Sequence, residues 1–184
     1  MMKVSATSLK GLYLIETNLI NDERGYFMRL FCRNELGELL GDRIIKQVNH
    51  SCTKQAGSIR GMHFQYQPKA EAKFVRCLKG RVFDAAIDLR QGSETFLQWY
   101  GCELSVNNRK MLFIPEGFAH GFQTLEENSE MLYLHTEFYS STHEGGIRYN
   151  DNRVEIEWPI SVTEVSERDR QHPLLSADFD GIKI

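Results

Sequence analysis

The 184-residue sequence lacks long hydrophobic runs and lacks a large excess of charge of either sign. No apolar stretch approaches the roughly 20 residues that span a bilayer, so we expect no membrane segment. Lys and Arg number 22 against 25 Asp and Glu, and the resulting net charge of −3 excludes the extended basic surface that binds nucleic acid. A composition of 26% charged and 41% hydrophobic residues also excludes intrinsic disorder.

Proline is scarce, at four residues, and the chain has no internal repeat, no low-complexity run and no Ser/Pro-rich linker. We therefore predict a single domain over residues 1–184, which is long enough to bury a core without disulfide or metal support. The N-terminal residues also lack the apolar segment of a secretory signal, so a cytoplasmic protein is expected.

Cysteines are few and unpaired in pattern: Cys32, Cys52, Cys77 and Cys102 form no CxxC motif. Together with the expected cytoplasmic location, this spacing indicates reduced thiols rather than a disulfide framework. None of the four has an activating neighbour in the sequence, so we interpret them as small buried hydrophobic residues rather than nucleophiles.

Apolar residues that alternate with polar ones dominate the chain, and this period of two predicts strands over residues 73–78, 81–89, 110–114 and 130–138. Short strands at this density predict an all-β sandwich or barrel. Helical pattern is limited to residues 34–40, which Gly37 interrupts, and to a short turn that begins near Ser166.

The dipeptide Lys79-Gly80 predicts a tight hairpin between two of these strands. In that register Lys73 lies diagonal to Asp84 on one face, within reach for long side chains of opposite charge. The other face carries the apolar residues of the two strands, so the simplest interpretation places Lys73 and Asp84 on a solvated face.

Six histidines are present, and two of them fall in motifs similar to the histidine motifs of cupins, which are small jelly-roll barrels. These are Gly61-Met-His63 and Pro115-Glu-Gly-Phe-Ala-His120. Metal-binding cupins carry a second His and a Glu in the first motif, whereas Gln65 stands two residues after His63 here. The incomplete ligand set favours a metal-free cupin in which His63 acts as a base.

Longer motifs make the resemblance specific. They comprise Arg60-Gly-Met-His-Phe-Gln65, Lys73, Val82-Phe-Asp84, Ile114-Pro-Glu-Gly-Phe-Ala-His-Gly-Phe122, Leu132-Tyr133, and Gly146-Ile-Arg-Tyr-Asn-Asp151 with Trp158-Pro159. In order and spacing this set resembles the dTDP-4-dehydrorhamnose 3,5-epimerase family, from about residue 11 to residue 173. The resemblance implies a cupin-type jelly-roll barrel with a few short helices.

The family's reaction implies four catalytic residues. Its substrate is a nucleoside-diphospho-4-keto-6-deoxy sugar, in which C3 and C5 flank a ketone, so a proton on either carbon can leave to give an enolate. The resemblance implies that His63 is the base, that Asp169 pairs with it, that Tyr133 is the acid on the opposite face, and that Lys73 lies beside the enolate oxygen. No metal and no redox cofactor is needed.

Without the resemblance, each of these residues has an ordinary structural explanation. His63 is then a hydrogen-bonded strand residue, Asp169 caps a helix, Tyr133 is a half-buried aromatic residue, and Lys73 is solvated. The resemblance gives Asp84 a purpose beside Lys73, because a carboxylate holds an ammonium group in position.

The resemblance also implies a substrate-binding set. Arg24 and Arg60 match positions near the diphosphate, where guanidinium groups suit pairs of oxygens. Strict alternation places Arg60 and His63 on opposite faces, so we predict a β-bulge at Gly61. The remaining matched positions line the nucleotide or the sugar: Phe27, Arg29, Gln47, Asn49, Asp84, His120, Tyr139 and Glu144. Arg29 departs from the family, which usually has Glu there.

The leading hypothesis is 3,5-epimerisation of dTDP-4-keto-6-deoxy-D-glucose by a homodimer, since family members share residues of an N-terminal strand across the dimer interface. Epimerisation at one carbon only, or on another nucleotide, is the alternative within the same class. A metal-dependent cupin such as a dioxygenase and a non-catalytic sugar-binding module are the alternatives from other classes. The expected partner is a nucleoside-diphosphate keto-deoxy sugar.

Overall fold

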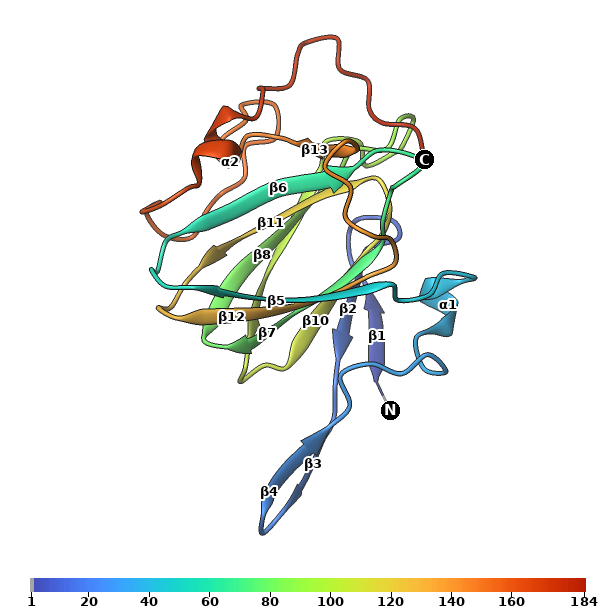
Figure 1. Cartoon of the computed structure of the whole chain (residues 1–184), viewed down its shortest axis with the longest axis vertical. Helices are drawn as coiled ribbons and strands as arrows, with labels where there is room; N and C mark the ends of the chain where they lie inside the picture. Colours follow the sequence, from blue (N-terminus) through green and yellow to red (C-terminus); the bar gives the residue numbers. More distant parts are fainter. Residues whose placement is uncertain (1) are drawn as a thin grey trace.

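The computed structural model describes residues 2–184, and antiparallel strands in two facing sheets make up most of their regular secondary structure (Figure 1). In the six-stranded sheet the order is β1 (Lys3–Ala6), β2 (Tyr13–Glu16), β10 (Lys110–Ile114), β7 (Lys73–Lys79), β12 (Ser129–His135) and β5 (Gln47–Thr53). In the five-stranded sheet it is β13 (Glu144–Gly146), β6 (Ile59–Gln65), β11 (Phe118–Thr124), β8 (Arg81–Asp88) and β9 (Trp99–Ser105). This architecture confirms the expected all-β, cupin-type jelly roll.

Among the described residues, helical structure is limited to α1 (Gly37–Leu40) and α2 (Glu167–Gln171). The predicted helix over 34–40 starts only at Gly37, and no side chain caps its N-terminus. The start of α2 is as predicted, since the Asp169 backbone N–H donates to Ser166 Oγ at 3.1 Å. Within residues 2–184, neither helix has the length and apolar character needed to cross a membrane.

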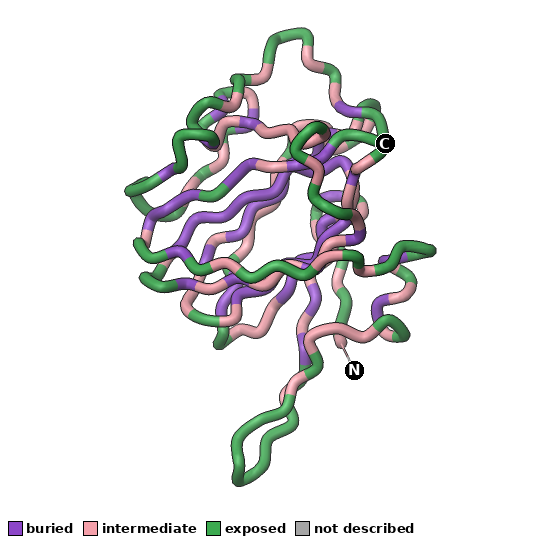
Figure 2. The backbone as a smooth tube through the Cα atoms, viewed as in Figure 1, coloured by how far each residue is buried: buried purple, intermediate pink, exposed green. Residues whose placement is uncertain are grey.

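The core between the two sheets explains the alternating pattern of the strands. Val75 and Leu112 from one sheet and Ala86 and Phe122 from the other belong to one buried cluster. Figure 2 shows the buried stretches concentrated in the facing strands. The cluster borders the polar side chains between the sheets, because Tyr133 packs against it.

The outer faces of both sheets are also covered, which the alternation alone did not indicate. Phe74 and Leu134 pack with Leu40 of α1 outside the six-stranded sheet. Ile87 packs with Ile147 of the C-terminal region outside the five-stranded sheet. Because apolar side chains point outward as well, the polar residues between them point into the barrel instead of into solvent.

The predicted hairpin at Lys79-Gly80 is wrong. The connection is tight, but β7 pairs with β10 and β12, whereas β8 pairs with β9 and β11. Gly80, with φ +74°, is therefore a corner at which the chain passes from one sheet to the other, and a Cβ there would lie 2.5 Å from Ser129 Oγ. The expected diagonal register of Lys73 and Asp84 does not exist, because a two-residue corner and a two-residue hairpin share the same sequence signature.

The predicted bulge in β6 is confirmed. His63 lies opposite His120 of β11, whereas Arg60 lies opposite Phe122, so three steps along β6 match two along β11. Gly61 has φ +132°, and a Cβ there would meet Gly121 Cα at 2.5 Å. The extra residue turns Arg60 and His63 toward the same cavity.

A two-stranded hairpin of β3 (Leu19–Asp22) and β4 (Gly25–Met28) projects from the barrel (Figure 1). Figure 2 shows that its tip is exposed along its whole length. Three large hydrophobic side chains of this arm, Ile20, Tyr26 and Phe27, are 63–66% exposed. Exposed apolar groups on an extended hairpin are typical of a surface that packs against another protein.

Candidate active site

A cavity of about 410 Å³ opens between the two sheets, beside the apolar core. Strands of both sheets contribute to its wall, and eight of the predicted site residues line it. These are Asn49, Arg60, His63, Lys73, His120, Tyr133, Tyr139 and Glu144; the other lining residues are His50, Ser51, Glu71, Phe122 and His135. The volume is in the range of small-molecule sites.

A histidine and a carboxylate form the centre of one wall. His63 Nε2 donates to Asp169 Oδ1 at 2.8 Å, joining β6 to α2. Asp169 Oδ2 accepts from the Gly61 backbone N–H at 3.2 Å, so the bulge also holds the carboxylate. With Nε2 bonded to Asp169, the other ring nitrogen, Nδ1, is the one left to exchange protons with a ligand.

The charge of Asp169 is fixed by its surroundings. Burial raises the pKa of this carboxyl, but the hydrogen bond and charge of His63, the Gly61 N–H and the Arg168 guanidinium together hold the pKa well below its usual range. The ionised carboxylate therefore accepts hydrogen bonds and donates none, and its negative charge stabilises a positive charge on His63. Asp169 is 2% exposed, which keeps water away from this pair.

Tyr133 lies on β12, in the sheet opposite to that of His63. Its hydroxyl is 2.9 Å from Ser51 Oγ, and its ring makes edge contact with His120 at 6.4 Å between centroids. Burial raises the pKa of Tyr133 far above its ordinary value, so the phenol stays protonated near neutral pH. The site thus presents a proton acceptor on one wall and a proton donor on the other.

His120 and Asp84 form a second histidine–carboxylate pair at the base of the cavity. Nε2 of His120 donates to Asp84 Oδ2 at 2.9 Å, and both residues are at most 5% exposed. Burial lowers the pKa of His120 despite the neighbouring carboxylate, so the ring is neutral at pH 7. Asp84 is thus near the cavity, as expected, but it positions His120.

Lys73 has a different carboxylate partner from the one predicted. Its Nζ donates to Glu71 Oε1 at 3.1 Å, and the side chain is 7% exposed, so neither Lys73 nor Asp84 lies on a solvated face. The predicted Lys73–Asp84 partnership is wrong because it depended on the hairpin register. Lys73 nevertheless lines the cavity, and it lies directly opposite His135 in the pairing of β7 with β12.

The predicted nucleotide-side residues surround the mouth of the cavity. Gln47 Nε2 donates to Asn49 Oδ1 at 3.1 Å, and the Tyr139 backbone N–H donates to Gln47 Oε1 at 3.1 Å. The Tyr139 hydroxyl donates to Glu144 Oε2 at 3.1 Å. Arg60 is held by Thr53 Oγ1 at 2.8 Å and lines the same cavity. These contacts gather amide, aromatic and guanidinium groups in one place.

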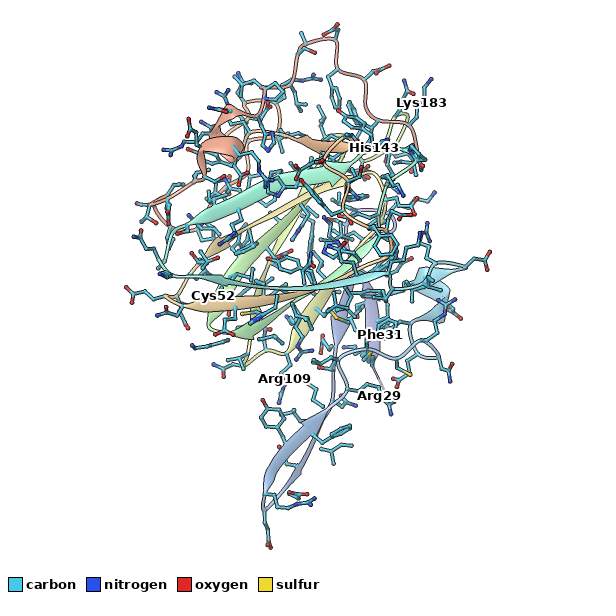
Figure 3. The ribbon with its side chains drawn as sticks, in the orientation of Figure 1. Arg29, Phe31, Cys52, Arg109, His143 and Lys183 are labelled. Carbon is cyan, nitrogen blue, oxygen red and sulfur yellow. The ribbon has the colours of Figure 1, made fainter. Side chains whose placement is uncertain are left out.

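Five predicted binding residues do not line this cavity. Gln47 and Asp84 contact residues that do, whereas Arg24, Phe27 and Arg29 lie away from it. Arg24 is on the projecting hairpin, with its side chain 88% exposed and paired with Asp22 at 2.5 Å. Phe27 is on the same hairpin, and Arg29 lies near its base, where it pairs with Glu35 (Figure 3). Within one chain, therefore, the arm does not contribute to the cavity between its own sheets.

Several residues of the cavity wall were not predicted from the sequence: His50, Ser51, Glu71, Phe122 and His135. His135 follows Tyr133 by two residues, so the period of the strand places both side chains on one face, and this signal was available. Glu71 precedes β7 in a loop and had no periodic signal. Its role became visible only through its contacts with Lys73 and His135.

Within the described residues, one group of three side chains has the donors to hold a metal ion: His63, Asp169 and His172, whose donor atoms lie within 4.8 Å of one another. The Arg168 guanidinium lies 3.2 Å from His63 Nε2 and 3.4 Å from Asp169 Oδ1. A cationic side chain thus occupies the space beside two of the three donors. The arrangement fits a hydrogen-bonded dyad better than a metal centre.

The four cysteines are free and carry no catalytic arrangement. Burial raises the pKa of Cys77 to about 11 and that of Cys102 to about 12, which makes both poor nucleophiles. The interpretation as buried hydrophobic residues holds for Cys77 alone among the four; Cys32 and Cys102 are half-buried, and for the exposed Cys52 it is wrong. Its label in Figure 3 marks its place on β5.

A cupin-type barrel with an imidazole and a phenol on opposite walls of one cavity has the arrangement of an enzyme that moves protons on a ligand held between its sheets. A family model described as dTDP-4-dehydrorhamnose 3,5-epimerase matches residues 6–177. The dTDP-4-dehydrorhamnose 3,5-epimerase of Salmonella typhimurium is 45% identical over 177 residues, which cover 95% of this chain and 96% of that protein. The chain therefore belongs to the dTDP-4-dehydrorhamnose 3,5-epimerase family, as the motifs predicted.

Solved structures agree with this assignment. The dTDP-4-dehydrorhamnose 3,5-epimerase of Bacillus anthracis, with TDP and PPi bound, superimposes with a TM-score of 0.91 at 39% identity, covering 95% of this chain and all of that one. The Legionella pneumophila dTDP-6-deoxy-D-glucose-3,5-epimerase, in complex with dTDP-4-keto-L-rhamnose, gives a TM-score of 0.92 at 35% identity over the full length of both chains.

Proposed function

We propose that this epimerase inverts C3 and C5 of dTDP-4-keto-6-deoxy-D-glucose to give dTDP-4-keto-L-rhamnose. The observation that carries the proposal is the placement of His63 on β6 and Tyr133 on β12, in opposite walls of one cavity. Inversion of a carbon requires that its proton leave from one side and that another arrive from the opposite side. Two proton-handling groups on one wall do not meet this requirement.

Each inversion begins with His63. Its Nδ1 takes the proton from the carbon next to the C4 ketone, the C–H electron pair moves to form the enolate, and the ring becomes an imidazolium. Asp169, 2.8 Å from Nε2, stabilises that positive charge. The same dyad serves C3 and C5 in turn because both carbons flank one ketone.

The enolate oxygen carries the negative charge that develops in this step. Lys73 is the buried ammonium group of the cavity wall and supplies an oriented positive charge to that oxygen. Tyr133 then donates its phenolic proton to the carbon from the opposite side, and its elevated pKa keeps that proton in place until the enolate forms. The phenolate regains a proton from solvent, and the His63 imidazolium releases its proton to solvent before the next inversion.

Binding of the substrate depends on groups at the mouth of the cavity. Arg60 pairs with diphosphate oxygens, and Asn49, Gln47 and Tyr139 surround the nucleoside. A net charge of −3 does not oppose this, because a diphosphate needs only a few local cations. The requirement for a nucleoside diphosphate distinguishes this site from that of a plain sugar-binding module.

The active form in this proposal is a homodimer in which the β3–β4 hairpin of one protomer completes the cavity of its partner. The exposed Ile20, Tyr26 and Phe27 support this, because their own chain leaves most of their side-chain surface uncovered. Arg24 and Arg29 would then reach the phosphate and the base of a substrate bound to the other protomer. Light scattering should give a mass of two chains for the protein in solution. Co-expression of Arg24→Ala with His63→Asn then tests the exchange of arms. Activity returns only if arms are exchanged, because the cavity that keeps His63 then receives the arm that keeps Arg24.

The reaction is tested by incubating the protein with the keto sugar in deuterated buffer and following C3 and C5 by NMR. Deuterium at both carbons supports 3,5-epimerisation. Deuterium at one carbon indicates a single-site epimerase. Exchange that occurs only when the keto sugar carries another nucleobase identifies a different nucleotide sugar as the substrate. No exchange with any of the nucleotide sugars would exclude the proposal.

A further inference from the structure

The partner of Lys73 is a carboxylate that bridges two groups of the cavity wall. Glu71 lies in the loop before β7, and its Oε1 accepts from Lys73 Nζ at 3.1 Å. Its Oε2 accepts from His135 Nδ1 at 2.9 Å. The side chains of the three residues are only 7–12% exposed. An ammonium group, a carboxylate and an imidazole therefore form one nearly buried array.

The protonation of this array follows from its contacts. Burial raises the pKa of the Glu71 carboxyl, but the charge of Lys73 and the hydrogen bond from His135 outweigh burial and lower the pKa to about 2. The ionised carboxylate only accepts, so the His135 proton at this contact lies on Nδ1. His135 Nε2 then faces Asn49 Nδ2, which lies 3.3 Å away.

Strand register extends the array across the sheet. Lys73 of β7, His135 of β12 and Gln47 of β5 are direct neighbours on three adjacent strands. Gln47 Nε2 donates to Asn49 Oδ1 at 3.1 Å, and Asn49 contacts His135. A continuous series of hydrogen bonds thus joins the amides at the nucleoside end of the cavity to the ammonium group at its catalytic end.

The geometry points to Glu71 and His135 as positioning residues that aim the Lys73 ammonium group at the enolate oxygen and couple its position to the amide pair Gln47–Asn49. This inference rests on the proposed function, because it takes from it the roles of Lys73 and of the two amides. It adds two residues that belong to neither the acid–base set nor the predicted binding set.

A lysine needs such support more than other cationic residues do. Its ammonium group is a compact charge on a flexible four-carbon stem, whereas catalysis requires it at hydrogen-bond distance from one oxygen. Glu71 fixes that group from one side, and His135 in turn fixes Glu71. Loss of either contact leaves the charge in the wall but without a fixed direction, which lowers kcat more than it weakens substrate binding.

The test compares Glu71→Gln and His135→Leu with the wild type in the full-length protein. We expect kcat to fall at least about tenfold in each variant, with KM within about threefold, because only transition-state stabilisation is lost. Glu137→Gln is the matched control: Glu137 also pairs with lysines, Lys46 and Lys69, but it lies outside the cavity. Its kcat should stay within about twofold of the wild type.

A second set of variants separates positioning from a general structural effect. In a Lys73→Gln background, Glu71→Gln and His135→Leu should cost no more than about a further twofold in kcat, since the group they position is gone. Multiplicative losses in that background, or a wild-type kcat in either single variant, overturn the inference. Where Glu71→Gln yields no folded protein, the His135→Leu comparison decides. A wild-type protein that exchanges no deuterium contradicts the proposed function instead.

Discussion

Replacing Asp169 by Asn tests the catalytic dyad with little change of shape. The substitution keeps the side-chain volume but removes the charge that faces His63 Nε2 at 2.8 Å. An amide also presents an N–H to the ring, which favours the tautomer with its proton on Nδ1. That tautomer has no lone pair toward the cavity and cannot accept the substrate proton.

The size of the effect follows from the electrostatics. An imidazolium and a carboxylate about 4 Å apart attract by about 4 kcal/mol at an effective dielectric constant of about 20. At about 1.4 kcal/mol for each tenfold change, loss of this attraction in the transition state lowers kcat about a thousandfold. KM should change little, because Asp169 lies behind His63 and does not line the cavity.

The assay is the steady-state rate of deuterium incorporation at C3 and C5, with KM obtained from the dependence on substrate concentration. Thermal unfolding of the variant checks the fold, because the Gly61 N–H loses a charged acceptor worth about 1.5–3 kcal/mol. A folded Asp169→Asn protein that retains more than about a tenth of the wild-type kcat would refute the role of the dyad.

Four further predictions follow from the same contacts. Tyr133→Phe should leave the first deprotonation and its solvent exchange measurable by NMR while strongly reducing inversion at C5; full inversion would contradict the assignment of the acid. Asp84→Ala should lower the free energy of unfolding by about 1–3 kcal/mol in urea titrations, because His120 loses its buried partner; unchanged stability would argue against the pair. Gly61→Ala should lower the free energy of unfolding by more than about 2 kcal/mol, because the added Cβ would meet Gly121 and because φ at this position is +132°; a wild-type urea midpoint would contradict the bulge. Folding lowers the Glu71 pKa from 4.5 to about 2, so its contribution is present above pH 4.5 and lost as the pH falls toward 2; Glu71→Gln should reduce the acid-dependent loss of stability by about 3 kcal/mol, and an unaltered pH profile would contradict this.

The strands could be predicted from local sequence, because alternation is a local signal, whereas the pairing of His63 with Asp169 was expected only from the family resemblance. Alternation located β7, β8 and β10 to within a residue or so, and Gly61 marked the bulge that brings Arg60 and His63 to one cavity. The order of strands in the sheets left no such signal. Lys79-Gly80 has the same composition whether the next strand pairs beside β7 or crosses to the other sheet.

The error in strand pairing carried over to the site. The sequence suggested that a carboxylate would hold Lys73, and one does, but it is Glu71 in a loop and not Asp84 on β8. Loop residues have no periodicity, so their direction is decided by tertiary contacts. The placement of Arg24 and Phe27 on a projecting arm was likewise not predictable from the strands alone, because two short strands that leave the barrel have the pattern of any hairpin.

The central claim is that one histidine removes the protons from both carbons. It is tested most directly by following deuterium incorporation at C3 and C5 in His63→Asn, beside the wild type and beside His143→Asn, whose imidazole is bonded to Ser140 outside the cavity. We predict that incorporation disappears at both carbons in His63→Asn and continues at both in His143→Asn. Intact incorporation at either carbon in folded His63→Asn would show that another group is the base for that carbon.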